Sequence, residues 1–311
     1  MNHSSPNIAV LGAGAIGCLY GLRLARQNSV VLLGRNPEKI RKMRDHGILL
    51  QSSSREERYF VDTGLSGTFS QQLPPMDLVL VTVKAHQLAK AVEENHALFL
   101  RGNPIVCLLM NGGDNPRFFN NLIPEERLVL AITTYNSMRI NDTLIRHSDL
   151  GLTTVGPDTP NGNKVAGILR EAGFAPSIDP DIRRSIWKKL FVNSIINPLT
   201  AIHGIYNRDL LDSSRFMPQI DQILTEAIRI ARAEGYLFDF DEMKKHVLRI
   251  AENTGKCESS MLQDIRHKRL TEIDEINGTL VRLAQKHELP CTVNMELIRH
   301  IHLLEKQFTL E

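Results

Sequence analysis

The stretch Asn7-Ile8-Ala9-Val10-Leu11-Gly12-Ala13-Gly14-Ala15-Ile16-Gly17 decides the fold of the first half of the chain. Its first five residues, of which four are apolar, predict a short strand, and a helical pattern follows over 15–27. A G-x-G-x-x-G pattern between a strand and a helix indicates a dinucleotide-binding turn, whereas a glycine-rich turn without a ligand is the alternative. Gly12 permits the tight turn, Gly14 lets a pyrophosphate approach the backbone, and Gly17 lets helix and strand pack closely. The pyrophosphate would lie on the free N–H groups at the start of the helix.

The second predicted strand, 29–33, leads into Gly34-Arg35-Asn36. An NAD-binding fold usually has Asp or Glu at this position, where the carboxylate accepts from the ribose 2′-hydroxyl. Neither acid is present, and the guanidinium of Arg35 suits a 2′-phosphate. The position therefore favours NADP as the cofactor. An exposed surface arginine is the other interpretation.

Strands and helices alternate as far as about residue 178, which predicts a doubly wound sheet. We expect buried strands at 77–83, 104–110 and 127–134, crossover helices at 85–100 and 115–122, a hairpin of 143–147 with 150–155 that extends the sheet, a loop at 157–162, a helix ending at 172 and a short strand ending at 178. Lys84 and Asn111 follow two of these strands at their carboxyl ends, the edge where such sheets bind ligands. A solvated lysine and a plain turn are the alternatives.

From residue 181 onward the patterns predict helices only. After a first helix at 185–201, we expect helices at 216–235, 241–254, 258–268, 272–287 and 293–308. The predicted fold is thus a Rossmann-type doubly wound α/β domain at 7–180, followed by an all-helical domain at 181–308.

The first of these helices, 185–201, is apolar almost all round, so we expect it to be buried and to break at Pro198. Lys189, Asn193 and Asn197 recur every fourth residue and therefore share one face. A buried ammonium is costly unless it is paired or used in chemistry, so this stripe could hold a small polar anion near the domain junction. A satisfied structural network, with Lys189 reaching solvent, is the alternative.

The bulk composition excludes several classes of protein. With 311 residues, 42% of them hydrophobic, the chain can bury the cores of two domains. A formal charge of +2 without a dominant basic run argues against nucleic acid as a partner. The cysteines are too far apart for a metal site and indicate reduced thiols; they are Cys18, Cys107, Cys257 and Cys291. Since neither a signal peptide nor a membrane span is recognisable, we expect a cytoplasmic protein that does not bind membranes.

Over essentially its whole length the chain resembles the ketopantoate reductase (2-dehydropantoate 2-reductase) family. The motifs that carry the resemblance are 12–17, Val83-Lys84-Ala85-His86-Gln87, Asn111-Gly112, Trp187-Lys188-Lys189-Leu190, Asn193, Asn197-Pro198-Leu199-Thr200-Ala201, Asn207, 259–264 and 271–278. The resemblance implies NADPH-dependent reduction of 2-dehydropantoate to (R)-pantoate, a step toward pantothenate and coenzyme A.

The resemblance also implies roles for individual residues. Lys189 matches the catalytic lysine, and Glu272 matches a carboxylate that serves both catalysis and cofactor binding. The positions implied for substrate binding are Asn111, Asn193, Asn197, Asn207 and Ser260. The positions implied for cofactor binding are Gly12, Ala13, Gly14, Ala15, Ile16, Gly17, Arg35, Lys84, Asn111 and Glu272. No metal is implied.

Hydride addition to C2 of a 2-oxo acid creates an alkoxide, which the Lys189 ammonium can stabilise and protonate. One departure from the family concerns the segment 110–114, where the family more often has Gln before Asn-Gly and no acid such as Asp114 after it. Three functions stay open: ketopantoate reductase, a related NADP-dependent oxo-acid reductase with another substrate, and a non-catalytic NADP-binding sensor. The expected partner is a small 2-oxo acid, and assembly as a homodimer is left open.

Overall fold

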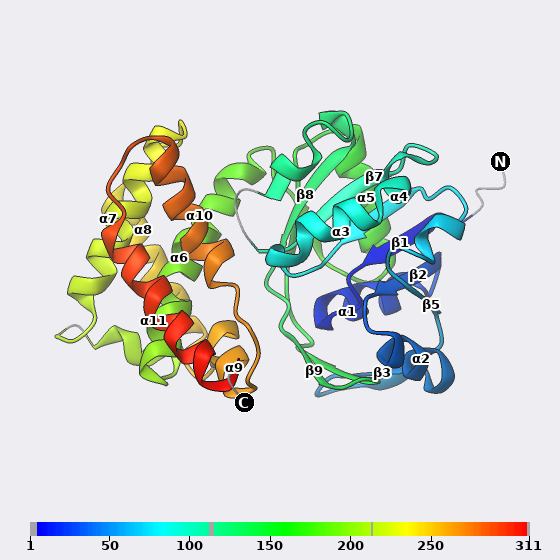
Figure 1. The fold of residues 1–311 in the computed structure, drawn as a ribbon, viewed down its shortest axis with the longest axis horizontal. Coiled ribbons are helices and arrows are strands. Elements are labelled where there is room, and N and C mark those ends of the chain that lie inside the picture. The colour runs from blue at the N-terminus through cyan, green and yellow to red at the C-terminus, as the bar shows by residue number, and fades with distance from the viewer. Residues whose placement is uncertain (1–4, 112–114, 213, 310–311) are drawn as a thin grey trace. The chain divides into compact units, whose positions relative to one another are not determined.

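The structure, a computed structural model, describes residues 5–111, 115–212 and 214–309 of the chain. These residues form two compact units. Unit 1 comprises residues 5–110 and 115–182, and unit 2 comprises residue 111 and the described residues from 183 onward. In Figure 1, unit 1 runs from blue to green and holds all of the strands that the structure describes, whereas unit 2 runs from green to red and is helical. The predicted fold class, an α/β part followed by an all-helical part, is confirmed.

Unit 1 is built on an eight-stranded sheet. Its strands, in spatial order, are β12 (Pro176–Ile178), β11 (Thr153–Gly156), β8 (Leu128–Thr133), β7 (Ile105–Leu109), β6 (Leu78–Val81), β1 (Asn7–Leu11), β2 (Ser29–Gly34) and β5 (Asp62–Leu65). All neighbouring strands are parallel except β11 and β8. From β1 the chain moves to β2 and β5 on one side, and it later returns to β6 on the other side. The strand order thus reverses between β1 and β6, the place where doubly wound sheets bind ligands.

The helices of unit 1 match the predicted ones only in part, and the helix predicted at 15–27 already ends at Leu24. They are α1 (Ala15–Leu24), α2 (Pro37–His46), α3 (Leu88–Glu94), α4 (His96–Leu100) and α5 (Pro160–Glu171). The predicted helix at 85–100 is divided into a 3₁₀ turn, α3 and α4. Asn95 separates α3 from α4. Its Nδ2 donates to Ala91 O and to Ser66 Oγ, and the bond to the Ala91 carbonyl competes with the hydrogen bonds of the helix backbone.

The predicted helix at 115–122 is wrong, since only a 3₁₀ turn forms there, at Asn115–Phe119. Two asparagines, Asn120 and Asn121, are poor helix formers. In addition, Pro124 disfavours helical backbone at the residue before it. These two effects limit the helix to a single short turn.

The predicted hairpin of 143–147 with 150–155 is also wrong. β10 (Leu144–His147) belongs to a separate four-stranded sheet, whose other strands are β3 (Ile48–Gln51), β4 (Glu56–Tyr59) and β9 (Ser137–Asn141). In that sheet β10 pairs antiparallel with β9 and parallel with β3, while β11 remains in the main sheet beside β8. The turn that joins β9 to β10 begins at Asn141. Its Oδ1 accepts from Thr143 N at 2.9 Å, as asparagine often does in turns.

Unit 2 packs helices around α6. Its helices are α6 (Ile182–His203), α7 (Met217–Ala233), α8 (Phe240–Asn253), α9 (Ser260–Arg266), α10 (Ile273–Lys286) and α11 (Thr292–Thr309). Each helix predicted in this half is present within a few residues of its expected ends. Phe191 and Ile195 of α6 are fully buried in the apolar core that the other helices complete. Across the ranges that the structure describes, no helix has the length and apolar character needed to span a membrane.

The break predicted at Pro198 is wrong, because α6 continues through this residue. Proline has no N–H, so the carbonyl of Ser194, four residues earlier, lacks its usual helical donor. The structure supplies a replacement, since Nδ2 of Asn277 in α10 donates to Ser194 O at 2.9 Å. Both Ser194 and Asn277 are completely buried. One side chain of α10 therefore satisfies the gap that proline leaves in α6 and links the two helices.

Candidate active site

The three glycines of the turn after β1 serve three different purposes. Gly12 has φ +119°, a conformation that favours glycine. A Cβ on Gly17 would lie 1.9 Å from Gly12 O, so this position must be glycine for α1 to pack against the turn. A Cβ on Gly14, by contrast, would have its nearest protein neighbour 4.0 Å away. The space beside Gly14 is open, as a bound pyrophosphate requires.

A cavity of about 310 Å³ lies at this turn and at the carboxyl ends of β1, β2 and β6. Its lining includes Gly12, Ala13, Gly14, Gly34, Arg35, Asn36, Lys39, Ser66, Thr82, Lys84 and Gln87. Among the predicted cofactor residues of unit 1, Arg35 and Lys84 line it together with the first half of the glycine turn. Ala15, Ile16 and Gly17 begin α1, whose N-terminal N–H groups suit a pyrophosphate. These features fit a dinucleotide.

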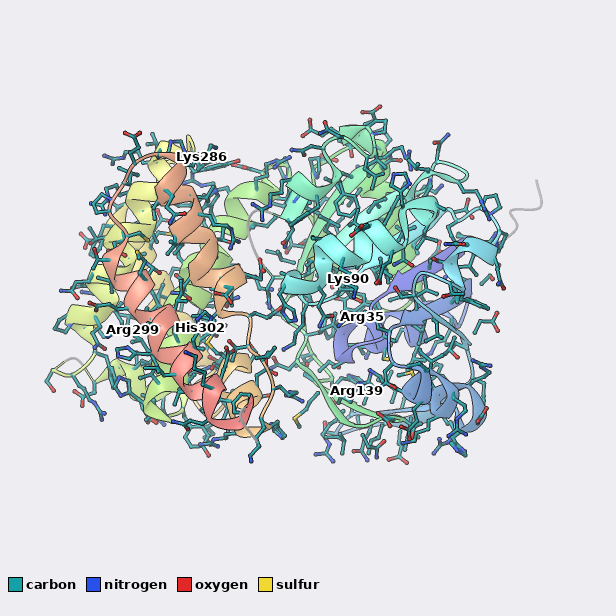
Figure 2. The ribbon with its side chains drawn as sticks, in the orientation of Figure 1. Arg35, Lys90, Arg139, Lys286, Arg299 and His302 are labelled. Carbon is teal, nitrogen blue, oxygen red and sulfur yellow. The ribbon has the colours of Figure 1, made fainter. Side chains whose placement is uncertain are left out.

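Lys39 of α2 also lines this cavity, although the sequence analysis did not single it out. Its Nζ donates to Ala13 O at 2.7 Å, and Nη2 of Arg139 donates to the same carbonyl at 2.6 Å. Figure 2 labels Arg35 and Arg139, both in unit 1. Burial, and to a smaller extent the nearby positive charge of Arg139, lowers the pKa of Lys39 to about 8. The signal in the sequence was its spacing, since Lys39 follows Arg35 by four residues at the start of a helix.

In unit 2, α6 carries the predicted stripe of Lys189, Asn193 and Asn197 on one face. Lys189 and Asn193 are half-buried, and Asn197 is only 5% exposed. Burial lowers the pKa of Lys189 to about 8, while the negative charge of Glu272 acts in the opposite direction. Such an ammonium is charged at neutral pH and yet gives up its proton more readily than an ordinary lysine.

Glu272 stands at the N-terminus of α10. Hydrogen bonds fix both its side chain and the backbone of the residue before it. Its Oε2 accepts from Nδ2 of Asn111 at 2.9 Å. The residue before it, Thr271, donates its backbone N–H to Oε1 of the buried Glu305 in α11, at 2.7 Å. The structure thus brings together Lys189, Glu272 and Asn111, which the sequence placed far apart. Asp114, the departure noted above, lies outside the described residues, as do residues 112 and 113.

The two remaining predicted substrate residues contribute differently. Ser260 is exposed at the first turn of α9, and the preceding Ser259 receives a hydrogen bond from Thr200 Oγ1 of α6 at 2.7 Å. Asn207 is buried, and its Nδ2 donates to Thr254 Oγ1 at 2.9 Å. Within the part of the chain that the structure describes, Asn207 Oδ1 has no hydrogen-bond partner, so this is the atom of Asn207 left for a ligand.

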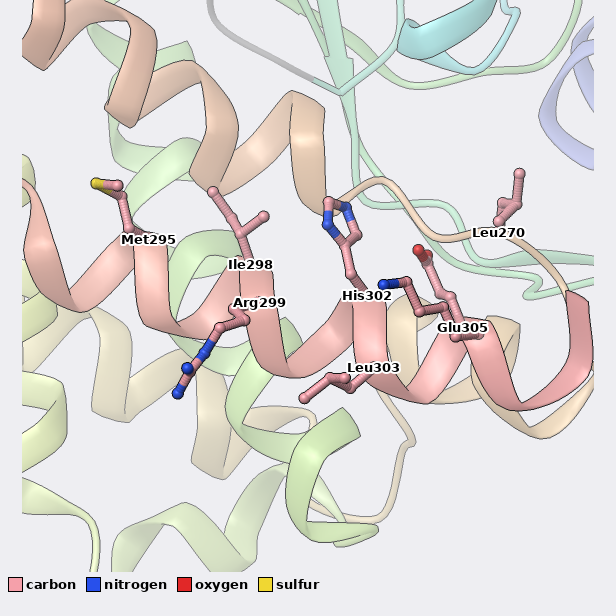
Figure 3. A pocket seen from close by; sticks show the side chains of 8 residues that line it. Leu270, Met295, Ile298, Arg299, His302, Leu303 and Glu305 are labelled. Atoms are coloured by element: carbon pink, nitrogen blue, oxygen red, sulfur yellow. The ribbon is translucent and has the colours of Figure 1, made fainter.

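A second cavity, of about 430 Å³, runs along α11 (Figure 3). Its lining mixes apolar and basic side chains with one acid: Leu270, Met295, Ile298, Arg299, His302, Leu303, Glu305 and Lys306. Because Glu305 also accepts from Thr271 N, this cavity adjoins the segment that leads to Glu272. None of the predicted site residues lines it.

Family models match most of the chain. The model described as "Ketopantoate reductase PanE/ApbA" matches residues 8–160, and the model of the family's C-terminal part matches residues 181–305. The 2-dehydropantoate 2-reductase of Vibrio cholerae serotype O1 is 31% identical over 307 residues, which cover 97% of this chain and 99% of that protein. The 2-dehydropantoate 2-reductase of Halobacterium salinarum is 27% identical over 305 residues, covering 96% and 99%.

Solved structures with the same fold include two informative relatives. D-mandelate dehydrogenase with NADH and anilino(oxo)acetate matches with a TM-score of 0.89 at 26% identity, covering 97% of this chain and 99% of that one. A PanE/ApbA family ketopantoate reductase from Ralstonia eutropha JMP134 matches with a TM-score of 0.87 at 28% identity and the same coverage. The predicted family and enzyme class are confirmed. This chain belongs to the ketopantoate reductase family and is an NADP-dependent oxidoreductase.

Proposed function

We propose that this protein reduces 2-dehydropantoate to (R)-pantoate with NADPH, in the cytoplasm, as a step of pantothenate and coenzyme A biosynthesis. The observation that carries the proposal is the group of Lys189, Glu272 and Asn111. It combines an ammonium whose pKa is lowered to about 8 with a carboxylate that is itself fixed by a hydrogen bond. A proton donor and a group that orients it are what the protonation of a developing alkoxide requires.

In the proposed reaction, Lys189 is the proton donor. When bound, NADPH would supply a hydride to C2 of the substrate, which would place the electron pair of the C2=O π bond on the oxygen. Nζ of Lys189 donates a proton to that oxygen, so the product is the 2-hydroxy acid and the lysine is left neutral until solvent reprotonates it. Glu272 keeps the ammonium oriented and charged, and Asn111 holds Glu272 in place.

The substrate's polar groups are bound, in this proposal, by Asn193 and Asn197 beside the lysine, with Ser260 and the free acceptor of Asn207 as further contacts. Burial of an amide side chain costs free energy unless the amide has a hydrogen-bond partner. The carboxylate and the hydroxyl of 2-dehydropantoate offer such partners. In unit 1, the glycine turn takes the pyrophosphate, Arg35 takes the 2′-phosphate, and Lys84 lies in the same cavity.

A second candidate function is the reduction of a 2-oxo acid with a larger apolar substituent. It is favoured by the likeness to D-mandelate dehydrogenase, whose solved complex holds anilino(oxo)acetate. It also agrees with the departure from the family sequence around Asn111. In this case the catalytic group would be unchanged, and the substrate pocket alone would differ.

Turnover of NADPH, followed by its absorbance, tests the proposal with three oxo acids: 2-dehydropantoate, 2-oxoisovalerate and phenylglyoxylate. 2-Oxoisovalerate lacks only the hydroxymethyl group of 2-dehydropantoate. A pocket that hydrogen-bonds the hydroxyl should prefer 2-dehydropantoate by as much as about 10⁴-fold in kcat/KM, whereas an apolar pocket would separate the two by about 10- to 200-fold. We expect the larger preference.

The other outcomes of this test are equally informative. Highest kcat/KM with phenylglyoxylate would replace the proposal by the second candidate. Tight NADPH binding without turnover of any oxo acid would indicate a sensor in place of an enzyme.

A further inference from the structure

We propose that Lys39 is a second cation for the 2′-phosphate of NADP, acting beside Arg35, and that it contributes to the choice of NADP over NAD. Both residues line the cavity at the glycine turn. Arg35 is exposed just before α2, and Lys39 lies in the first turn of that helix. Oδ1 of Asn36 accepts from Lys39 N at 2.9 Å, which fixes the backbone of this turn.

The hydrogen-bond partner of Lys39 carries no net charge. The ammonium donates to Ala13 O, a neutral carbonyl that already receives the Arg139 guanidinium at 2.6 Å. Two cations therefore converge on one carbonyl. Lys42, one turn further along α2, shows the contrast, because it pairs with Glu38 at 3.1 Å and with Asp142 at 3.0 Å. A phosphate beside Arg35 would give the Lys39 ammonium a negatively charged hydrogen-bond partner.

The charged and titratable groups that face Lys39 come from three other parts of unit 1. Arg139 of β9 opposes the protonated ammonium, while Asp142 of the β9–β10 turn and Cys18 of α1 favour it. Burial has the largest effect and lowers the pKa of Lys39 to about 8. A dianion bound nearby favours the charged lysine, so phosphate binding and protonation of Lys39 reinforce one another.

The test compares NADPH with NADH, which differ only by the 2′-phosphate. In Lys39→Met, the dissociation constant of NADPH, measured by titration calorimetry at fixed ionic strength, should rise about tenfold or more, as expected for a lost charge-assisted contact. The dissociation constant of NADH should change by less than about threefold. Lys39→Arg should retain most of the affinity for NADPH. Arg41→Met is the matched control, because it removes a positive charge from the exposed side of the same helix, where Arg41 pairs with Asp45.

The pH dependence gives a second measurement on the unaltered protein, which does not require any variant to fold. NADPH affinity should fall as the pH rises through about 8, and NADH affinity should stay level. Adenosine 2′,5′-bisphosphate compared with AMP should show the same difference.

Three results would overturn the proposal. Equal losses of NADPH and NADH affinity in Lys39→Met would show that Lys39 only holds the glycine turn through Ala13. An unchanged NADPH affinity in this variant would exclude contact with the phosphate. Parallel pH profiles for the two cofactors would do the same.

Discussion

The cofactor cavity of unit 1 and the catalytic group of unit 2 differ in how far apart in the sequence their contacts reach. The cavity lies at a glycine turn, and the roles of the turn's three glycines follow from contacts within a few residues or with the adjacent strand. The catalytic group is formed by side chains from separate segments, and its Asn111–Glu272 hydrogen bond joins residues 161 positions apart. The glycine turn depends on the absence of side chains at its glycines, and the catalytic group depends on helices keeping their positions. Substitutions should therefore separate the two regions cleanly.

The largest expected effect comes from removing the proton donor. Lys189→Ala should lower kcat by about a hundredfold or more, because general acid catalysis of this kind contributes 10²–10⁴-fold. The dissociation constant of NADPH should remain nearly unchanged, since the cofactor cavity lies in unit 1. Stopped-flow turnover and calorimetric binding measure the two quantities. Lys188→Ala is the matched control, and near-normal turnover in Lys189→Ala would remove the proposed mechanism.

The next effect distinguishes two glycines of one turn. Gly14→Ala places a methyl group in open space at the cavity, so NADPH affinity should fall about 10- to 100-fold with little change in Tm. Gly17→Ala forces a Cβ against the backbone of Gly12, so Tm itself should fall. Thermal unfolding without cofactor and NADPH titration separate these outcomes. If both variants lost only thermal stability, Gly14 would serve packing and not the cofactor.

The third effect concerns the pH profile of turnover. Because Lys189 must be protonated to donate, the rate of reduction should fall as the pH rises through about 8, the pKa to which burial lowers this lysine. Glu272 raises that pKa, so Glu272→Gln should move the fall to a lower pH and reduce turnover at pH 7 about tenfold. Rates measured from pH 5 to 9 check this. A shift toward higher pH in Glu272→Gln would contradict the assigned pairing.

The same contrast explains what could be predicted from the sequence. The glycine turn, Arg35 and the stripe of Lys189, Asn193 and Asn197 each lie within one short segment, so local spacing was enough to find them. The place of Lys39 in the cavity was missed because it depends on how α2 packs against the glycine turn.

Two of the errors in the fold have the same origin. The pairing of β10 with β3 joins segments far apart in the chain, and no local pattern marked it. Pro198 was expected to break its helix because the compensating donor, Asn277, lies 79 residues later (277 − 198). Local rules fail where a distant side chain replaces a missing backbone group.

The smallest expected effect tests that replacement directly. In Asn277→Leu the buried carbonyl of Ser194 loses its donor, which should reduce the free energy of unfolding by about 1–3 kcal/mol. Asn294 Oδ1, which also accepts from Asn277, contributes to this loss. Since α6 carries Lys189, turnover should fall a few-fold as well.

Pro198→Ala restores an N–H that can reach Ser194 O through the helix's own hydrogen bond. Asn277→Leu should therefore reduce the free energy of unfolding less when it is made in Pro198→Ala than when it is made in the unaltered protein. The expected coupling in a double-mutant cycle is about 0.5–3 kcal/mol. Recovery should be partial, because Asn294 Oδ1 remains without its donor. Denaturant unfolding of the four proteins measures the coupling. Strictly additive losses would mean that α6 passes through Pro198 without help from Asn277.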